Sequence, residues 1–379
     1  MTPRPGLLTR RGFLGVLGVG ATGMLLAGCT APGDAAAPEQ GAPSAPVVRE
    51  RGLQGSTDPV GVRVGLILGP PSMGLSRFLQ AADAGLTYND FSFEVAGIDY
   101  AALAARFNQG DFDIVTLPSN LGAVLYNNDE LRTEVRVISV NNLGVLYIVT
   151  ADPSVSSLDD LRGRTVYSIG EGGTPEYTIA TVLSGYGIAD EVEMSYRPTP
   201  FEVLNLLQQE EGSIALLPQP FVELAKTMAE GLRTPIDITE EWARMPGNTT
   251  GSQAVTTHTI VNRRFLEEHE AAVVEYLQQA GASVDYTLDH IAETAALQEE
   301  LGTFLNDEVA ARAMPFCSMV NLTGTVMHDA LSGFLAALHA RNPDSIGGAM
   351  PGADFYYMPP AGAMDTGIRE LVAAQEEAG

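Results

Sequence analysis

The sequence is poor in cysteine and in basic residues. It has 379 residues but only two cysteines, Cys29 and Cys317, and Lys226 is its sole lysine. Acidic residues outnumber basic ones by 47 to 21, which gives a formal net charge of −26. No basic stripe is present to bind a phosphate backbone, so we expect no nucleic-acid partner. We also expect no disulfide, because Cys29 has a separate role described below, and we interpret Cys317 as a small buried residue rather than a reactive thiol.

The motifs of common catalytic and metal sites are also missing. The five histidines do not show the spacing of metal ligands, and neither a G-x-S-x-G elbow nor a G-x-x-x-x-G-K-[ST] loop occurs. Gly170-Glu171-Gly172 is followed by Pro175, where a dinucleotide fingerprint requires glycine. We therefore predict no catalytic residue, no metal and no cofactor, and a protein that is not an enzyme. His258, a lone histidine on an expected strand, is interpreted as structural.

Long hydrophobic runs are scarce, and the most apolar one lies near the start of the chain. Arg10 and Arg11 precede an apolar segment, residues 13–27, that is shorter than the ~20 residues needed to cross a bilayer. A basic start, a short apolar segment and small residues before a cut site form an export signal. We therefore expect residues 1–28 to be a signal peptide, the alternative being a buried apolar helix with a chance cysteine.

The end of this segment predicts a lipid anchor. Leu26-Ala27-Gly28-Cys29 resembles the bacterial lipobox, in which the cysteine is lipidated and becomes the mature N-terminus. Arg10-Arg11 before Phe13-Leu14 resembles the twin-arginine signal, but Gly15 replaces its usual lysine, so the general export route stays open. Residues 29–57 are rich in Ala, Pro and Gly and are expected to form a lipidated flexible tether. The folded part would then be exported and held at the outer face of the cell membrane or in the periplasm.

The remaining chain alternates between strand and helix patterns. Helix is expected over 100–108, where Leu103 and Phe107 lie four residues apart on one face. A short helix over 157–163 has Ser157 as its N-cap and Gly163 as its stop. This alternation predicts βαβ units and largely parallel sheets, followed by a mostly helical region over 264–342. The expected strands are 62–68, 91–95, 112–117, 135–138, 146–150, 165–169, 213–217 and 257–261.

Four loops are expected at the carboxyl ends of parallel strands, namely 69–74, 118–120, 172–176 and 218–221. In open α/β sheets, ligands bind at this edge, where helix N-termini present free N–H groups. At Thr174-Pro175 we expect threonine to cap the helix and proline to take the first helical position. Each loop alone is typical of an ordinary capped turn, whereas four such loops in two sets indicate a cleft that binds a ligand.

The charge of these loops limits how they can hold a ligand. They contain neither Arg nor Lys, and Arg77 is the nearest cation in sequence. An anionic ligand would therefore depend on helix N-termini and hydroxyls rather than on a guanidinium clamp. Glu171 and Glu176 are interpreted as solvent-facing or helix-capping, and Tyr177 as either a core residue or a stacking platform.

Seven stretches carry a resemblance to a known family, namely 144–150, 157–167, 173–177, 214–221, 259–262, 342–348 and 354–357. Taken in order, they resemble the ABC-transporter substrate-binding proteins of the nitrate/sulfonate/taurine and thiamine-pyrimidine group. No single stretch is diagnostic, but together they cover nearly all of the expected folded part. The thiamine-pyrimidine enzymes of that superfamily use clustered histidines and cysteines, which this chain lacks.

The resemblance implies a type II-like periplasmic-binding-protein fold. Two α/β lobes, each a mostly parallel sheet flanked by helices, would be joined by two crossing strands. Lobe I would comprise 58–142 plus 263–379, and lobe II would comprise 143–262. By the same analogy the ligand would contact Ser72, Met73, Ser119, Asn120, Asn142, Gly173, Thr174 and Gln219.

The expected function is that of a solute-binding lipoprotein that delivers a small organic molecule to an ABC importer. The partners would be that molecule, the permease and ATPase subunits, and the membrane through the lipid anchor. A sulfonate, a taurine-like or a pyrimidine-like compound fits the resemblance, and the sequence does not choose among them. Two alternatives remain: an enzyme on the same scaffold, or a lipoprotein that senses its ligand and passes the signal to a receptor.

Overall fold

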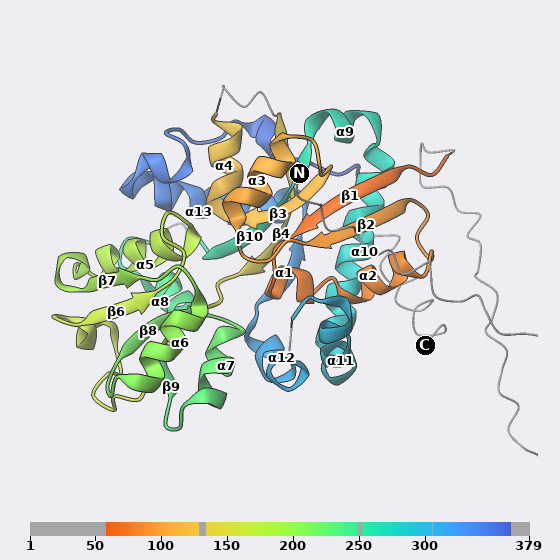
Figure 1. Cartoon of the computed structure of the whole chain (residues 1–379). Coiled ribbons are helices and arrows are strands. Elements are labelled where there is room, and N and C mark those ends of the chain that lie inside the picture. The colour runs from red at the N-terminus through yellow and green to blue at the C-terminus, as the bar shows by residue number, and fades with distance from the viewer. Residues whose placement is uncertain (1–57, 129–133, 249–251, 305, 365–379) are drawn as a thin grey trace, which may run out of the picture. The chain divides into compact units, whose positions relative to one another are not determined.

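The computed structural model describes residues 58–128, 134–248, 252–304 and 306–364. The expected signal peptide, the lipidation residue Cys29 and the tether lie outside the described residues. The described chain forms two separate sheets, each with helices packed against it (Figure 1). Among its helices none is both long enough and apolar enough to span a bilayer.

The first sheet has six strands. Strand β1 pairs in parallel with β2 and β3, whereas β10 lies antiparallel between β3 and β4, and β11 is antiparallel to β4 at the edge. Strands β1 to β4 therefore share one direction, and β10 and β11 run against them. In spatial order the strands are β11 (Met319–Leu322), β4 (Val135–Leu143), β10 (Val255–Asn262), β3 (Ile114–Pro118), β1 (Gly61–Leu66) and β2 (Asp90–Val95).

The second sheet has five strands. Strand β6 pairs in parallel with β7 and β8, and β5 is antiparallel to both β8 and β9. Only β5 runs against the common direction. Both sheets therefore combine parallel and antiparallel pairs, within the α/β fold that was predicted. In spatial order the strands are β7 (Glu193–Tyr196), β6 (Thr165–Ser168), β8 (Ile214–Pro218), β5 (Leu146–Thr150) and β9 (Arg233–Asp237).

Helices connect the strands in both sets and make up most of the C-terminal part. The helices between the strands of the first sheet are α1 (Pro70–Met73), α2 (Ser76–Asp83), α3 (Tyr100–Asn108) and α4 (Ser119–Tyr126). Those of the second set are α5 (Thr174–Gly185), α6 (Pro200–Gln209), α7 (Phe221–Met228) and α8 (Ile238–Arg244). The C-terminal helices are α9 (Arg263–Glu268), α10 (Glu270–Asp289), α11 (Ile291–Leu301), α12 (Asp307–Ala313) and α13 (Gly324–Arg341).

The local patterns predict several elements well. Helix α3 has the predicted bounds, and Leu103 and Phe107 are each 1% exposed. The short helix before β6 is a 3-10 helix, Leu158–Leu161, and Ser157 caps it by pairing with Asp160. Strands β7, β9 and β11 were not predicted, because each is short and only partly buried and so lacks a clear alternation.

The position of β10 differs from the one that the expected lobe boundaries imply. We expected residues 143–262 to form lobe II, which would place β10 in it. Strand β10 instead pairs along its length with β3 and β4 of the first sheet. The reason is that the returning chain continues as a central strand, so that its buried residues Ile260 and Val261 join the first core.

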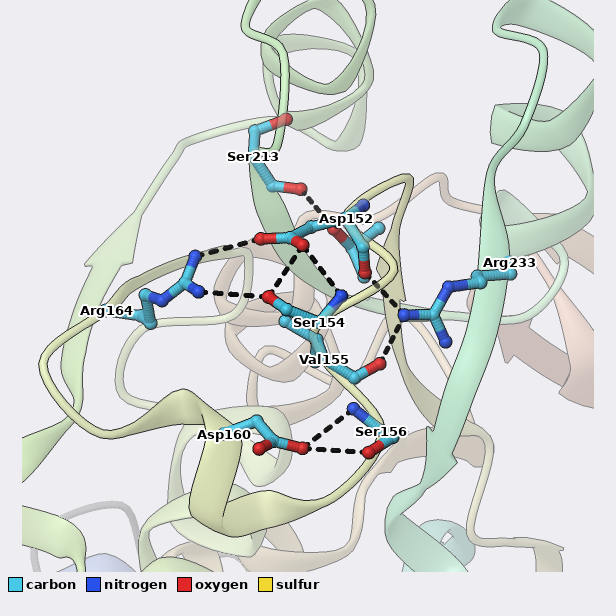
Figure 2. A network of polar contacts seen from close by, with 9 residues as sticks. Asp152, Ser154, Val155, Ser156, Asp160, Arg164, Ser213 and Arg233 are labelled. Atoms are coloured by element: carbon cyan, nitrogen blue, oxygen red, sulfur yellow. Dashed lines mark hydrogen bonds and ion pairs between the residues drawn. The ribbon is translucent and has the colours of Figure 1, made fainter.

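A polar network lies where β5 ends and β8 begins (Figure 2). Thr150, at the end of β5, pairs with Ile214 at the start of β8, and its hydroxyl donates to Ser213 O at 2.8 Å. Beyond it, the Asp152 carboxylate accepts from Arg164 Nη1 at 3.0 Å and from Ser154 Oγ at 2.7 Å. These contacts lower the pKa of Asp152 to about 2, the Ser154 bonds contributing most. The network holds the loop after β5 and takes no part in the candidate site.

Candidate functional site

The four predicted loops each lead from a strand into a helix. The loop at 69–74 leads to α1 and the loop at 118–120 opens α4; both follow parallel strands of the first sheet. The loop at 172–176 opens α5 and the loop at 218–221 opens α7; both follow parallel strands of the second sheet. Since the carboxyl ends of parallel strands lie at the same edge, each sheet presents two of these helix N-termini on one side.

A buried hydrogen bond joins the two sets of loops. Thr174 Oγ1 donates to Asn120 Oδ1 at 3.0 Å, and both residues are 1% exposed. Thr174 was expected to be the N-cap of its helix, but Gly173 takes that position and Thr174 is the first helical residue. The threonine hydroxyl is turned to Asn120 instead, because a buried hydroxyl needs a partner and the amide oxygen supplies one.

Asn120 also joins a third segment. Its Nδ2 donates to the backbone oxygen of Ser345 at 3.1 Å. Ser345 lies in the 3-10 helix Pro343–Ile346, which Asn342 caps by accepting from Asp344 N at 3.1 Å. Ser345 was not predicted as a neighbour of the site, although the pattern Asn342-Pro343-Asp344-Ser345 marks the capped turn that carries it.

Two of the expected ligand contacts have unpartnered polar atoms. Ser119 Oγ and Gln219 Oε1 are buried and make no hydrogen bond to any described residue. Ser119 is 0% exposed and Gln219 is 3% exposed. The backbone of Gln219 is fixed, because its N–H donates to Val145 O at 3.0 Å. Buried polar atoms are nearly always paired, so these two are the strongest local indication of a missing partner.

Ser72 and Met73 lie on α1 and are fully buried, and both contact other residues of the protein, including ones far along the chain such as Thr303, whose backbone oxygen lies 3.4 Å from Ser72 Oγ. Ser72 Oγ donates to Gly69 O at 3.0 Å and accepts from Gly69 N at 3.2 Å. Met73 packs in an apolar cluster with Val284 and Met319. The structure therefore gives both residues a role in shaping the loop between β1 and α2.

Asn142 is committed to the first sheet. Its Nδ2 donates to Cys317 O at 3.0 Å and its Oδ1 accepts from Thr257 Oγ1 at 2.9 Å. The side chain thus ties β4 to β10 and to the residues before β11. Of the eight expected contacts, only Asn120 and Thr174 are joined directly to each other by a hydrogen bond among the described residues.

Gly173 meets a close-packing requirement. A Cβ atom at this position would lie 3.3 Å from Gly170 O, which is tighter than an ordinary contact. Gly170 and Gly172 have positive φ angles of 81° and 73°, a backbone region that favours glycine. The glycines therefore allow the chain to turn sharply between β6 and α5.

Aromatic contacts also connect the two sets of elements. The Phe221 ring, on α7, lies 6.5 Å from the Phe304 ring in a T-shaped arrangement. Tyr147, on β5, donates from its hydroxyl to Phe316 O at 3.3 Å. Burial raises the pKa of Tyr147, and the negative charges of Asp237 and Glu240 add to the effect, so the hydroxyl stays a donor.

The loop before α5 is electrostatically negative. Glu176 accepts from Gly172 N at 2.6 Å, which is the capping role expected for it. Burial first, then the charges of Glu176 and Glu171, raise the pKa of Tyr196. Arg77, the nearest cation in sequence, lies with its guanidinium carbon 5.0 Å from the centre of the Tyr286 ring.

Two other residues singled out in the sequence are buried. Cys317 is a free cysteine, 0% exposed, and burial raises the pKa of its thiol, which agrees with the interpretation as a small core residue. His258 lies on β10 at 0% exposure, and burial lowers the pKa of its imidazole to about 3. Neither ring nitrogen of His258 has a hydrogen-bond partner among the described residues.

Comparison with known proteins identifies the fold. No protein-family model matches the sequence, and no curated protein matches it. Solved structures do match. An ABC transporter protein from Parabacteroides distasonis is 20% identical, with a TM-score of 0.65 over 79% of this chain and 99% of that one.

Two sulfonate-binding proteins are similar as well. The periplasmic aliphatic sulphonate binding protein SsuA of Escherichia coli is 16% identical, with a TM-score of 0.64 over 80% of this chain and 94% of that one. The alkanesulfonate-binding protein SsuA of Xanthomonas axonopodis pv. citri, solved with MOPS bound, is 12% identical, with a TM-score of 0.58 over 78% and 96%. The chain therefore has the two-lobed fold of the periplasmic binding proteins of ABC transporters.

Proposed function

We propose that the protein is an extracytoplasmic solute-binding lipoprotein that delivers a small polar organic molecule to an ABC importer. The ligand binds between the loops of the first sheet and those of the second. Binding stabilises the arrangement in which the two sets of loops are joined, and the permease recognises that arrangement. The protein acts by binding and release rather than by catalysis.

The hydrogen bond between Thr174 and Asn120, beside a buried hydroxyl without a partner, is the observation that carries this proposal. Ser119 precedes Asn120 directly at the start of α4, so an unsatisfied donor lies next to the contact that joins the loops. A ligand that accepts from Ser119 and donates to Gln219 Oε1 would satisfy both orphan atoms. A compound with an anionic oxygen at one end and an N–H group at the other has this chemistry.

A taurine-like or sulfonate-bearing amine meets these requirements. Its sulfonate oxygens accept from the Ser119 hydroxyl and from N–H groups of the α4 N-terminus. Its ammonium group donates to Gln219 Oε1. A pyrimidine carries donors and acceptors too and is the second compound class to test.

The export signal and the sequence ending in Cys29 support a lipid-anchored location outside the cytoplasm. Mass spectrometry of the purified mature protein tests this directly. A diacylated Cys29 at the N-terminus is expected, and a Cys29→Ala variant should leave the membrane fraction. A mature chain that starts elsewhere would contradict the lipoprotein assignment.

Calorimetry and thermal shift against taurine, alkanesulfonates and pyrimidines test the binding role. A true ligand raises the melting temperature by an amount that grows with the logarithm of its concentration once that concentration exceeds Kd. We expect at least one compound of the panel to bind and to be recovered unchanged after incubation. Recovery of an altered compound would favour the rival enzyme function, and no binding by any compound would count against the proposal.

Removing the unpartnered hydroxyl of Ser119 should affect ligand binding without affecting the stability of the fold. Ser119→Ala should weaken ligand affinity by about tenfold and leave the stability of the free protein unchanged, because the hydroxyl has no partner to lose. Ser283→Ala is the control: this buried serine accepts from Phe78 N at 3.1 Å, so its loss should lower stability and leave affinity unchanged. Equal affinities in wild type and Ser119→Ala would remove Ser119 from the site.

A further inference from the structure

A cavity lies between α5 and α13, and none of the eight residues expected to contact the ligand lines it. It has a volume of about 370 Å³, within the ~300–1,000 Å³ range of small-molecule sites. Helix α5 follows β6 of the second sheet, whereas α13 packs on β4 and β10 of the first. The cavity is therefore walled by both sets of elements. Its lining residues are Glu176, Tyr177, Ala180, Thr181, Leu338, Arg341 and Asn342.

The two walls carry opposite charges. Arg341 lies in the last turn of α13, and its guanidinium group forms no ion pair or hydrogen bond with any residue in the described ranges. Glu176 faces the cavity from α5, and no ion pair joins it to Arg341 within the described chain. Burial raises the pKa of Tyr177, and the negative charges of Glu176 and Asp344 add to this effect.

The surface between the charges is mainly apolar. Leu338 is 1% exposed, and Tyr177 and Ala180 are half-buried. Thr181 contributes little polarity, because its hydroxyl donates to Tyr177 O at 2.7 Å within the same helix. A ligand here meets a positive end, a negative end and an aromatic ring with aliphatic neighbours between them.

The cavity is connected to the contact that joins the two lobes. Asn120 binds Thr174 on one side and Ser345 on the other. Thr174 opens the helix turn that carries Glu176, and Ser345 Oγ donates to the backbone oxygen of Asn342 at 2.6 Å. The segments that Asn120 holds together are thus the segments that form the two walls of the cavity.

We propose that this cavity is a second binding site, for a zwitterion with a planar apolar body, and that its occupation favours the joined arrangement of the lobes. The anionic group of the ligand pairs with Arg341, its cationic group with Glu176, and its body lies against Tyr177. The site is separate from the proposed solute site, and the assignment stands whether or not that function is confirmed.

The test measures by calorimetry how tightly the full mature protein binds the probe 4-(aminomethyl)benzoate. Two control compounds each keep the ring and one of the two charges: 4-methylbenzoate keeps the carboxylate, and benzylamine keeps the ammonium group. We expect the zwitterion to bind at least about tenfold more tightly than either control compound, because two charge-assisted contacts are made instead of one. Equal affinity for all three compounds would overturn the proposal.

Variants locate the bound probe. Arg341→Gln should weaken binding of the zwitterion and of 4-methylbenzoate by about tenfold, while Glu176→Gln should weaken the zwitterion and benzylamine. Arg312→Gln is the matched control: Arg312 is an exposed arginine in the last turn of α12 without an ion pair among the described residues, and its loss should change nothing. Unchanged binding in Arg341→Gln would overturn the site.

A third variant distinguishes this site from the proposed solute site. Gln219→Leu removes an atom assigned to the solute and should leave probe binding intact. Probe binding that is lost in Gln219→Leu and kept in Arg341→Gln would place the probe with the solute and overturn the second site alone. Failure of every compound in the solute panel, with Arg341-dependent probe binding kept, would overturn only the proposed function.

Discussion

The hydroxyl of Thr174 donates to the amide oxygen of Asn120 across 3.0 Å, and the two residues belong to helices on different sheets. Both are buried, so neither group can exchange this partner for water without the surrounding elements separating. The bond therefore reports on the relation between the two lobes. It is short in range and directional, which makes it suited to favour one arrangement of the loops.

Loss of this bond should weaken the joined arrangement. Thr174→Val keeps the shape of the side chain but leaves Asn120 Oδ1 without its donor, at a cost of about 1–3 kcal/mol in the free energy of unfolding. Thr181→Val on the same helix is the control, since its hydroxyl bonds only within α5. Urea denaturation measures both. A Thr174→Val midpoint no lower than that of the control would contradict the assigned role.

Stability should depend on pH through His258. Burial lowers the pKa of this imidazole to about 3, whereas an unperturbed histidine titrates near 6.5. The unfolded chain therefore takes up a proton below about pH 6.5 that the folded chain refuses until about pH 3, so stability falls as pH falls through this window. The slope is about 1.4 kcal/mol per pH unit for one proton.

His258→Leu tests the pH effect. The variant removes the titrating ring and two unpartnered nitrogen atoms, so the free energy of unfolding should fall less steeply between pH 6.5 and pH 5. Denaturant titrations at four pH values suffice. If the free energy of unfolding changed equally with pH in wild type and variant, the pH dependence would not come from His258.

The stability of the fold should depend on the size of the side chain at position 144, where the chain passes from the first sheet to the second. A Cβ at this position, between β4 and β5, would lie 2.1 Å from Thr239 Oγ1 and 2.9 Å from Thr239 Cβ. Gly144→Ala should therefore destabilise the fold by about 1–3 kcal/mol. The double variant Gly144→Ala/Thr239→Gly removes every atom of the Thr239 side chain that the methyl group would meet and should recover part of the loss. A double variant as unstable as the sum of the two single variants would refute the steric explanation.

The network around Asp152 should affect stability without affecting the site. Asp152→Asn weakens the contacts to Arg164 and Ser154, so the midpoint of denaturation at neutral pH should fall while ligand affinity stays constant (Figure 2). The pKa of the carboxyl is lowered to about 2, so its contribution is present above pH 3.8 and is lost as pH falls through about 2. The two proteins should therefore converge in stability at low pH. A constant difference down to pH 2 would contradict this.

The sequence determined the features that depend on local periodicity and chain punctuation. Leu103 and Phe107 set the buried face of α3, and Ser157 with Gly163 bounded a short helix, because spacing and capping act over a few residues. The alternation of strands and helices predicted two mostly parallel sheets. It also placed four loops correctly, since the carboxyl ends of parallel strands share an edge whatever the rest of the chain does.

The tertiary structure alone decided which of these residues meet. Asn142 was expected to contact ligand, yet its amide is used by Cys317 and Thr257, both distant in sequence. Arg341 lies far along the chain from the loop at 172–176, and only the packing of α13 against α5 brings it beside Glu176. The physical reason is that hydrogen-bond partners and charge neighbours depend on contacts between remote segments, which spacing along a single chain does not encode.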